Sequence, residues 1–489
     1  MLYALAANKL AASIGKEMSI LQKSLISRKY KIPSRGNALG VAKKRLFLTA
    51  VLALAPLSTY GGTSEGVAPR RNQPEPMIVF SSNRALDGSD NIIFFTPKDR
   101  ISPGGFAMWN IWVVNTDGSV MPLTRHTAAS SSEPMWSPDG SKIVFASSGA
   151  LDGSDNSNFG FASNIWVMNA DGSGAKALTK LTAASSSSPV WSPDGSKIAF
   201  VSNRALDGRD AGMIIENIWL MDANGEGVKA LTKLSAADSY QPTWSPDSRR
   251  IAFLSTRALN GSNSVEGDTT DNIWVMNADG SAAIPLTKLT YGNKPITRTV
   301  SGTPIITGRS VLLFHANPTW SPDGSRIAFT SIRPFGDRTK WMHDDPKDWN
   351  HIDWGAFFDH SNYTIWTVTA DGSDISPLER VVNSGHGTGY PVWSPDGRKL
   401  AFSSDRPLEG DLSKKFHDVT NLWVINADGS DATALIGGGG LPAWSPDGKK
   451  IAYDNQCNIW TVNIDGSDAA SLTKQTRACN GSPRWRPAK

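Results

Sequence analysis

Three histidines share one stretch of this 489-residue chain with several aspartates, TKWMHDDPKDWNHIDWGAFFDH from Thr339 to His360. Imidazole and carboxylate ligands together can hold Zn²⁺ or Mn²⁺. The metal-ligating candidates are His343, His351, His360 and Asp353. Their spacing matches no compact metal motif, so the alternative, that they are solvated or partner-contacting loop residues, is favoured.

The same stretch concentrates tryptophan, which is typical of carbohydrate-binding surfaces. Of the 18 tryptophans, 14 belong to two short phrases that recur along the chain and are expected in a core. Three of the other four lie in the stretch from Thr339 to His360. A second candidate segment is GHGTGYPVW, which precedes and enters a repeated phrase. The ligand-binding candidates are Trp341, Trp349, Trp354, His386 and Tyr390.

A third element repeats acids at fixed offsets, as in NRALDGSDN from Asn83 and NRALDGRDA from Asn203. The acids concerned are Asp87, Asp90, Asp152, Asp155, Asp207 and Asp210. Ca²⁺ requires several oxygens from closely spaced acids and loop carbonyls, so these residues are candidate calcium ligands. The favoured alternative is that Asp-Gly makes the turn and that the arginines of this element pair with neighbouring acids.

Motifs for other chemistry are not found in the sequence. There is no phosphate-binding loop, no nucleophile–base motif and no dinucleotide fingerprint. The tetrapeptide Ser-Pro-Asp-Gly recurs along the chain as a turn sequence, and its aspartates are expected to be structural. The sequence therefore favours a binding role over an enzymatic one and leaves the question of catalysis open.

Two alternating phrases decide the fold. Trp-Ser-Pro-Asp-Gly, or a one-residue variant of it, begins at Trp136, Trp191, Trp244, Trp320, Trp393 and Trp444. Between the copies lie phrases such as NIWVMNADGS from Asn164. A unit of this size cannot bury its own apolar face and must stack on its neighbours. Each unit predicts four short strands joined by two tight turns and two longer connections, which is one blade of a β-propeller.

Counting the units predicts an all-β, seven-bladed propeller, with six or eight blades as alternatives. A seventh copy of the second strand, MIVFSSN from Met77, has no Trp-Ser-Pro-Asp-Gly before it. The missing strand lies at the other end of the chain, in PRWRPAK from Pro483 to Lys489. We therefore expect the C-terminal strand to complete the first blade and close the ring.

The combination of Pro-x-Trp-Ser-Pro-Asp-Gly, Ile-Ala-Phe and Ile-Trp-Val-Met-Asn-Ala-Asp-Gly resembles the TolB-type WD-like propeller repeat from about Met77 to Lys489. The resemblance implies the fold, whereas a propeller hosts many activities. TolB itself resembles a six-bladed propeller behind an α/β domain, so the seven units here depart from it. Related propellers cap prolyl-oligopeptidase-type peptidases, but the propeller region 71–489 contains no Gly-x-Ser-x-Gly elbow.

The N-terminal region, 1–61, has a different character from the propeller domain expected at 71–489. Its first 45 residues carry ten Lys or Arg and one acid, and LFLTAVLALAPL from Leu46 to Leu57 resembles a signal-peptide core. We expect export to the periplasm or the exterior, without a membrane span after signal removal. An upstream start-site misassignment would explain the long extension, and an amphipathic targeting segment is the alternative.

Cys457 and Cys479 are the only cysteines. Both fall in segments expected on the face that carries the long loops. In an oxidising compartment they could form a disulfide that pins the last blade to the ring closure, and the alternative is two free thiols.

These observations lead to three functional hypotheses. The first is an exported platform that captures a protein or glycan partner through the long-loop face. The alternatives are a metal-assisted polysaccharide lyase or hydrolase and a calcium-stabilised structural envelope protein. No cofactor is certain, and Ca²⁺ or one transition metal is the candidate. The whole chain has a net charge of +4, which the basic N-terminal region supplies, so the propeller is mildly acidic and nucleic acid is not expected as a partner.

Overall fold

The computed structural model describes residues 76–87, 89, 91–92, 94–95, 106–115, 117–152, 154, 162–264, 271–288, 296–300, 303–308, 315–331, 364–378, 388–405, 420–475 and 477–488. The propeller belongs to one compact unit, Asn72–Lys489. The described ranges contain no helical segment with the length and hydrophobicity that a bilayer crossing requires.

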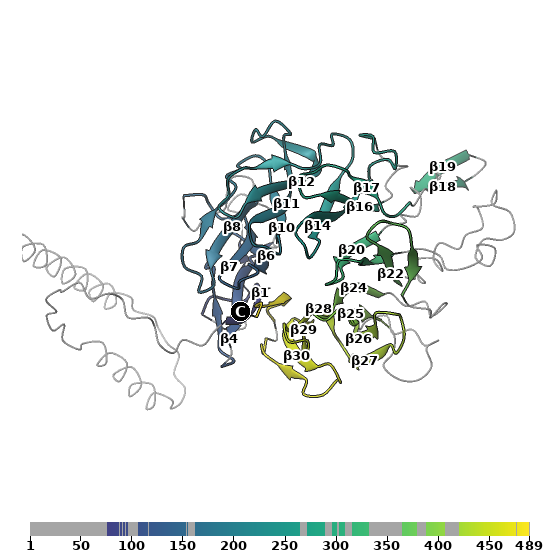
Figure 1. The fold of residues 1–489 in the computed structure, drawn as a ribbon. Coiled ribbons are helices and arrows are strands. Elements are labelled where there is room, and N and C mark those ends of the chain that lie inside the picture. Colours follow the sequence, from purple (N-terminus) through teal and green to yellow (C-terminus); the bar gives the residue numbers. More distant parts are fainter. Residues whose placement is uncertain are drawn as a thin grey trace, which may run out of the picture. The chain divides into compact units, whose positions relative to one another are not determined.

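Seven four-stranded antiparallel sheets form the blades of a ring, and their innermost strands surround its centre (Figure 1). Blade 1 contains, from inside to outside, β32 (Asn480–Trp485), β1 (Pro76–Ser82), β4 (Asn110–Asn115) and β5 (Val120–Pro122). Blade 2 contains β6 (Ser131–Trp136), β7 (Lys142–Ser147), β8 (Asn164–Asn169) and β9 (Lys176–Ala177). Blade 3 contains β10 (Ser186–Trp191), β11 (Lys197–Arg204), β12 (Gly212–Asp222) and β13 (Lys229–Ala230).

The remaining blades repeat the same order. Blade 4 contains β14 (Ser239–Trp244), β15 (Arg250–Ser255), β16 (Asn272–Asn277) and β17 (Ile284–Pro285). Blade 5 contains β20 (His315–Trp320), β21 (Arg326–Ser331), β22 (Thr364–Thr369) and β23 (Ile375–Pro377). Blade 6 contains β24 (Thr388–Trp393), β25 (Lys399–Ser404), β26 (Asn421–Asn426) and β27 (Thr433–Ile436). Blade 7 contains β28 (Gly440–Trp444), β29 (Lys450–Asn455), β30 (Asn458–Asn463) and β31 (Ala470–Ser471).

Two hairpins lie outside the blades. They pair β2 (Phe94–Phe95) with β3 (Phe106–Ala107), and β18 (Ile296–Val300) with β19 (Thr303–Gly308). The second hairpin lies between β17 of blade 4 and β20 of blade 5 in the chain.

The predicted ring closure is confirmed. β32 pairs antiparallel with β1, with Trp485 opposite Ile78 and Asn480 opposite Ser82. The prediction of seven blades is also confirmed, and six or eight are excluded. The two ends of the repeat region therefore complete one blade together.

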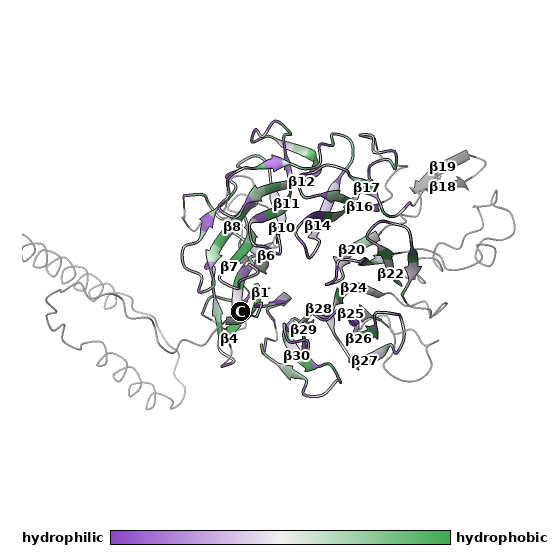
Figure 2. Ribbon diagram, in the orientation of Figure 1, coloured by the Kyte–Doolittle hydropathy of each residue, from purple (hydrophilic) through white to green (hydrophobic). Residues whose placement is uncertain are grey.

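The core lies between neighbouring blades rather than in one centre. Val201 and Leu220 of blade 3, for example, pack with Trp244, Phe253 and Trp274 of blade 4. Figure 2 shows hydrophobic residues on the blade strands, where hydrophilic residues are interspersed with them. Within each blade an aromatic residue of the second strand faces the tryptophan of the third strand, which is a favourable cross-strand pair. The pairs are Phe80–Trp112, Phe145–Trp166, Phe200–Trp219, Phe253–Trp274, Phe329–Trp366, Phe402–Trp423 and Tyr453–Trp460.

The Ser-Pro-Asp-Gly acids hold their own turns, as expected. In blade 2 the Ser137 hydroxyl donates to Asp139 Oδ1 at 2.5 Å, and the Ser141 N–H donates to the same oxygen at 3.0 Å. These hydrogen bonds, that of Ser137 first, lower the pKa of Asp139 to about 2. Gly140 follows with φ of 65°, the left-handed conformation that glycine adopts without steric cost.

A repeated asparagine ties the outer strands together. In blade 2, Asn164 Oδ1 accepts hydrogen bonds from the Thr179 hydroxyl and the Leu181 N–H, at 2.9 and 2.7 Å. Asn164 Nδ2 donates to the Leu181 carbonyl at 2.9 Å. An asparagine–threonine hydrogen bond of this kind recurs at Asn110–Thr124, Asn217–Thr232, Asn272–Thr287 and Asn458–Thr473. In these five blades the first asparagine of the third strand and the threonine after the fourth strand therefore position the start of the connection to the next blade.

Tryptophans of the innermost strands tie each blade to the one before it. Trp244 Nε1 of blade 4 donates to the Val190 carbonyl of blade 3 at 3.3 Å. The equivalent bonds join Trp136 to Arg484, Trp320 to Thr243, Trp393 to Thr319, Trp444 to Val392 and Trp485 to Ala443. Trp191 is the exception, because its buried Nε1 has no hydrogen-bond partner among the described residues.

Candidate functional site

All seven innermost strands bend at the same position. In each blade the residue before the proline of Pro-x-Trp has a positive φ, between 43° and 55°. The strand pairing shifts register there, as between Ser132 and Met135 in blade 2, which marks a β-bulge. We call the seven residues the inner rim: Glu133, Ser188, Gln241, Asn317, Tyr390, Leu441 and Ser482.

The inner rim is strained in the same way in every blade. A proline disfavours the right-handed helical region for the residue before it, and the bend is made at positive φ instead. That conformation costs a non-glycine residue about 1 kcal/mol. The side chains differ from blade to blade, and Glu133, Gln241 and Tyr390 are exposed. A constant backbone that presents different side chains suits the recognition of a ligand.

Two rim side chains reach the next blade. Glu133 Oε2 accepts the backbone N–H of Ser188 at 2.6 Å. Gln241 Oε1 accepts the backbone N–H of Asn317 at 2.9 Å. These bonds place a carboxylate and an amide at the inner edge of blades 2 and 4.

A pocket lies beside the rim on the long-loop face of blades 3 and 4. It has a volume of about 260 Å³ and is lined by Asn203, Ile214, Glu216, Asp238 and Tyr240. The Glu216 N–H donates to Asp238 Oδ1 at 2.8 Å, which fixes the loop before β14 against β12. Ile214 is 98% exposed, so the pocket has an apolar side as well as an acidic one.

Burial and like charge raise the pKa values of Glu216, which lines the pocket, and of Asp271, which hydrogen-bonds with the lining residue Tyr240. Partial burial, followed by the charges of Asp238 and Glu133, raises the pKa of Glu216. Burial and the charge of Asp238 raise the pKa of Asp271, although a hydrogen bond with Tyr240 opposes them. Burial, followed by the charge of Asp271, raises the pKa of Tyr240. No cation of the described residues contributes to the shifts of Glu216 and Asp271, so the negative charge is locally uncompensated.

Asp271 adds an unused acceptor to this surface. Its Oδ1 is buried and has no hydrogen-bond partner in the described part of the chain. Within that part, however, no group of three or more His, Cys, Asp or Glu is arranged to hold a metal ion.

Comparisons with known proteins agree with the repeat architecture. An uncharacterised protein of Agrobacterium fabrum is 26% identical over 358 residues, which cover 72% of this chain and 93% of that protein. The Tol-Pal system protein TolB of Anaeromyxobacter dehalogenans is 29% identical over 131 residues, which cover 27% of this chain and 20% of TolB. The chain is similar to TolB-type propellers.

A solved structure of a putative TolB from Agrobacterium tumefaciens covers 84% of this chain and 99% of its own. It is 17% identical, with a TM-score of 0.38. No family model matches the chain.

Most of the predicted ligand and metal residues lie outside the described residues of this TolB-like chain. They are Trp341, Trp349, Trp354, His386, His343, His351, His360 and Asp353. The metal-assisted lyase or hydrolase hypothesis depends on them and stays a prediction. The fifth ligand candidate, Tyr390, is the inner-rim residue of blade 6 and is 48% exposed.

Among the described calcium candidates, Asp87, Asp152 and Asp207 hold their own turns and Asp210 holds a more distant connection. Asp87 and Asp152 accept backbone N–H groups two residues ahead, and Asp207 pairs with Arg209 at 2.6 Å. Asp210 accepts the Thr182 N–H and hydroxyl and the N–H groups of Ala183 and Ala184. Although burial alone would raise the pKa of Asp210, these bonds lower it to about 2. Asp90 and Asp155 lie outside the described residues, and a calcium site stays a prediction.

Three arginines of the same element stack on tryptophans, and their expected pairing with neighbouring acids stays a prediction. Arg84 lies 4.6 Å from the Trp112 ring centroid, Arg204 lies 5.1 Å from that of Trp219, and Arg257 lies 3.8 Å from that of Trp274. For Arg257, burial lowers the pKa to about 10. Since each arginine lies at the end of the second strand of its blade or within two residues after it, the cation covers the aromatic pair of that blade.

The sequence did not point to Glu133, Glu216, Asp238 or Asp271. They lie on different strands and loops, so no local motif joins them. One signal was present: the residue before each Pro-x-Trp proline varies in a repeat that is otherwise uniform.

Proposed function

We propose that this protein is an exported TolB-like binding platform that captures a partner at the inner edge of its long-loop face. The observation that carries the proposal is the pocket between Glu216, Asp238 and Tyr240, which adjoins the strained inner rim. Its uncompensated carboxylates favour a partner that brings positive charge, and the exposed Ile214 offers an apolar contact. Export follows from the signal-like segment at 46–57 and agrees with the disulfide described below.

The partner is a protein or a glycan, and charge distinguishes the two in an experiment. Labelled hexalysine, hexaglutamate and an oligogalacturonate serve as defined probes. We expect hexalysine to bind most tightly, with an affinity that falls as ionic strength rises. Stronger binding of the acidic oligosaccharide than of hexalysine would contradict the proposal.

Substitutions of the acids that line the pocket test whether the probe binds there. Glu216→Gln combined with Asp238→Asn removes two charges and keeps both side-chain shapes. We expect this variant to weaken hexalysine binding at least fivefold. Glu226→Gln is the control, because Glu226 is an exposed acid of the same blade in the tight turn between β12 and β13. Equal losses in the two variants would show that the protein's overall charge binds the probe.

A further inference from the structure

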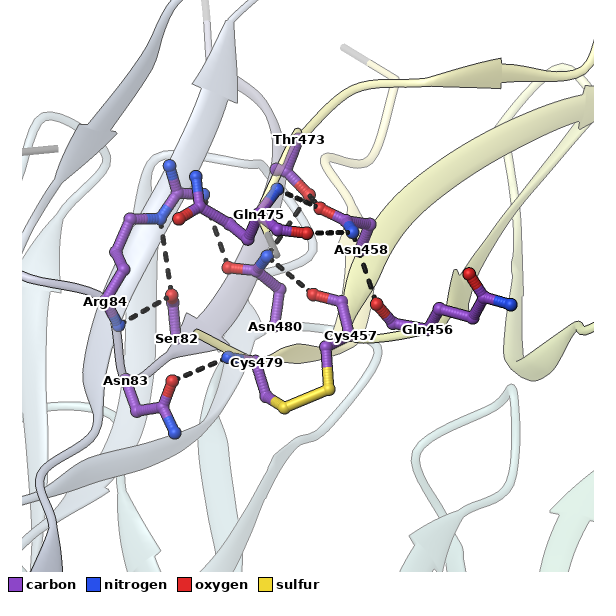
Figure 3. The surroundings of a disulfide bond; sticks show 10 residues. All are labelled: Ser82, Asn83, Arg84, Gln456, Cys457, Asn458, Thr473, Gln475, Cys479 and Asn480. Atoms are coloured by element: carbon purple, nitrogen blue, oxygen red, sulfur yellow. Dashed lines mark hydrogen bonds between the residues drawn. A yellow bond between two sulfur atoms is a disulfide. The ribbon is translucent and has the colours of Figure 1, made fainter. Parts of the chain in front are cut away.

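The two cysteines form a disulfide at the seam where the ring closes. Cys457 and Cys479 are joined with Cα atoms 4.1 Å apart (Figure 3). Cys457 lies in the turn between β29 and β30 of blade 7, and Cys479 lies directly before β32, which completes blade 1. The bond therefore crosslinks the last blade to the strand on which closure depends.

The turn that holds Cys457 differs from its counterparts in the other blades. Asn455 pairs directly with Asn458, so the connection is only the two residues Gln456 and Cys457, with φ of 47° and 64°. Two successive positive φ values define a type I′ turn, which normally selects asparagine or glycine. Here neither residue is of that kind, and the long loop expected at this place is replaced by a tight turn.

Hydrogen bonds around the disulfide converge on Asn480, the first residue of β32. Its N–H and its Nδ2 both donate to the Cys457 carbonyl, at 2.9 and 2.8 Å. Its Oδ1 accepts Arg84 Nη2 at 3.3 Å, as Figure 3 shows. Asn83 Oδ1 accepts the Cys479 N–H at 2.6 Å, and the Asn83 N–H donates to the Cys479 carbonyl at 3.1 Å. The start of β32 thus depends on the position of the Cys457 turn.

β32 holds three blades together. It pairs with β1 of its own blade, and Trp485 donates to Ala443 of blade 7. Its Arg484 carbonyl accepts Trp136 Nε1 of blade 2. Ser482, in the middle of β32, is the inner-rim residue of blade 1. Any loosening of this strand therefore reaches the candidate binding face.

Both cysteines are partly exposed, and Cys457 adjoins the exposed Gln456, so we expect a reductant to reach the disulfide. We propose that the Cys457–Cys479 disulfide is a redox-sensitive latch on the ring closure. A dithiol reductant supplies two electrons and two protons. The S–S bond breaks, each cysteine becomes a thiol, and the reductant becomes a disulfide. The freed turn no longer fixes the start of β32, and the seam between blades 7 and 1 opens more often.

The test compares hydrogen exchange of the full chain before and after reduction by dithiothreitol under native conditions. Exchange of 480–485 and of 76–82 rises at least tenfold on reduction, whereas exchange of β14 and β15 in blade 4 stays unchanged. The Tm falls by about 3 °C. Unchanged exchange at 480–485, or an equal rise in blade 4, would overturn the latch.

The Cys457→Ser/Cys479→Ser variant separates the latch from other effects of the reductant. It reproduces the exchange of the reduced protein and does not respond to dithiothreitol. If the variant does not fold, alkylation of the reduced wild-type protein gives the same comparison. A variant whose exchange at 480–485 still rises with dithiothreitol would overturn the proposal.

Discussion

The Ser188 backbone N–H of blade 3 donates to the Glu133 carboxylate of blade 2 at 2.6 Å, so one rim residue holds the next across a blade boundary. Both residues have the same left-handed backbone, with φ of 50° and 55°. The bond shows how the inner rim combines a repeated backbone bend with side chains that are specific to each blade.

Removing the acceptor of this bond should destabilise the protein. Glu133→Ala is expected to lower the free energy of unfolding by about 1 kcal/mol relative to Glu133→Gln, which keeps an acceptor oxygen. Both variants remove the charge near Glu216, so their difference reports the hydrogen bond. Urea unfolding measures it, and equal stabilities would show that the bond contributes nothing.

Two tryptophans of the innermost strands, Trp244 and Trp191, allow a matched pair of substitutions. Trp244 and Trp191 are both 7% exposed, but only Trp244 Nε1 has a described partner. Replacement by phenylalanine removes similar apolar surface from both sites. Trp244→Phe should therefore destabilise the protein by about 1 kcal/mol more than Trp191→Phe. The comparison uses the midpoints of chemical denaturation, and the opposite order would refute the role of the indole–carbonyl bonds.

Strain at the inner rim predicts an unusual response to glycine. Ser188→Gly should leave stability unchanged or raise it by up to about 1 kcal/mol, because glycine adopts positive φ freely. Ser187→Gly is the control, since Ser187 is a paired strand residue opposite Val201. That change should destabilise by about 0.5–1 kcal/mol. Destabilisation by Ser188→Gly of the same size as by Ser187→Gly would argue against a strained bulge.

The pocket acids predict the pH dependence of stability. The pKa values of Glu216 and Asp271 are raised in the folded state above their ordinary values of 4.5 and 3.8. Protonation therefore favours the folded state: this contribution is fully present below the ordinary values and is lost as the pH rises through the raised ones. Stability should therefore increase as the pH falls from neutral toward the ordinary values of 4.5 and 3.8.

Substitution of Glu216 and Asp271 tests this pH dependence of stability. The Glu216→Gln/Asp271→Asn variant should be more stable than wild type at pH 7 and should show a flatter profile. Turn acids such as Asp139, whose pKa is lowered to about 2, act oppositely and lose their contribution only as the pH falls through that value. Urea titrations from pH 7 to pH 5 measure the slope. A variant profile as steep as wild type would place the linked protons elsewhere.

The fold could be predicted because each repeat contains the residues that form its turns and its strands. Proline, aspartate and glycine fix the turn, and the Ile-Ala-Phe and Ile-Trp phrases supply strands of period two. The split of blade 1 between the two ends of the chain was visible because PRWRPAK supplied what MIVFSSN lacked. The calcium candidates could be only partly interpreted, since Asp210 binds the connection of a neighbouring blade, which sequence offsets do not reveal.

The inner rim and the pocket could not be predicted from local patterns. A left-handed residue is normally indicated by glycine, and none of the seven rim residues is glycine. The extension of β12 back to Gly212, which brings Glu216 against Asp238, depends on tertiary pairing. The Arg257–Trp274 contact was missed because arginine was matched to acids rather than to an aromatic ring.

The most direct test of the binding site is hydrogen exchange of the protein with and without hexalysine. The account predicts protection at 212–218 and 236–241, which form the pocket beside the inner rim, and no change in the tight turn at 223–228. Protection of 223–228, or binding without any protection at the pocket, would contradict it.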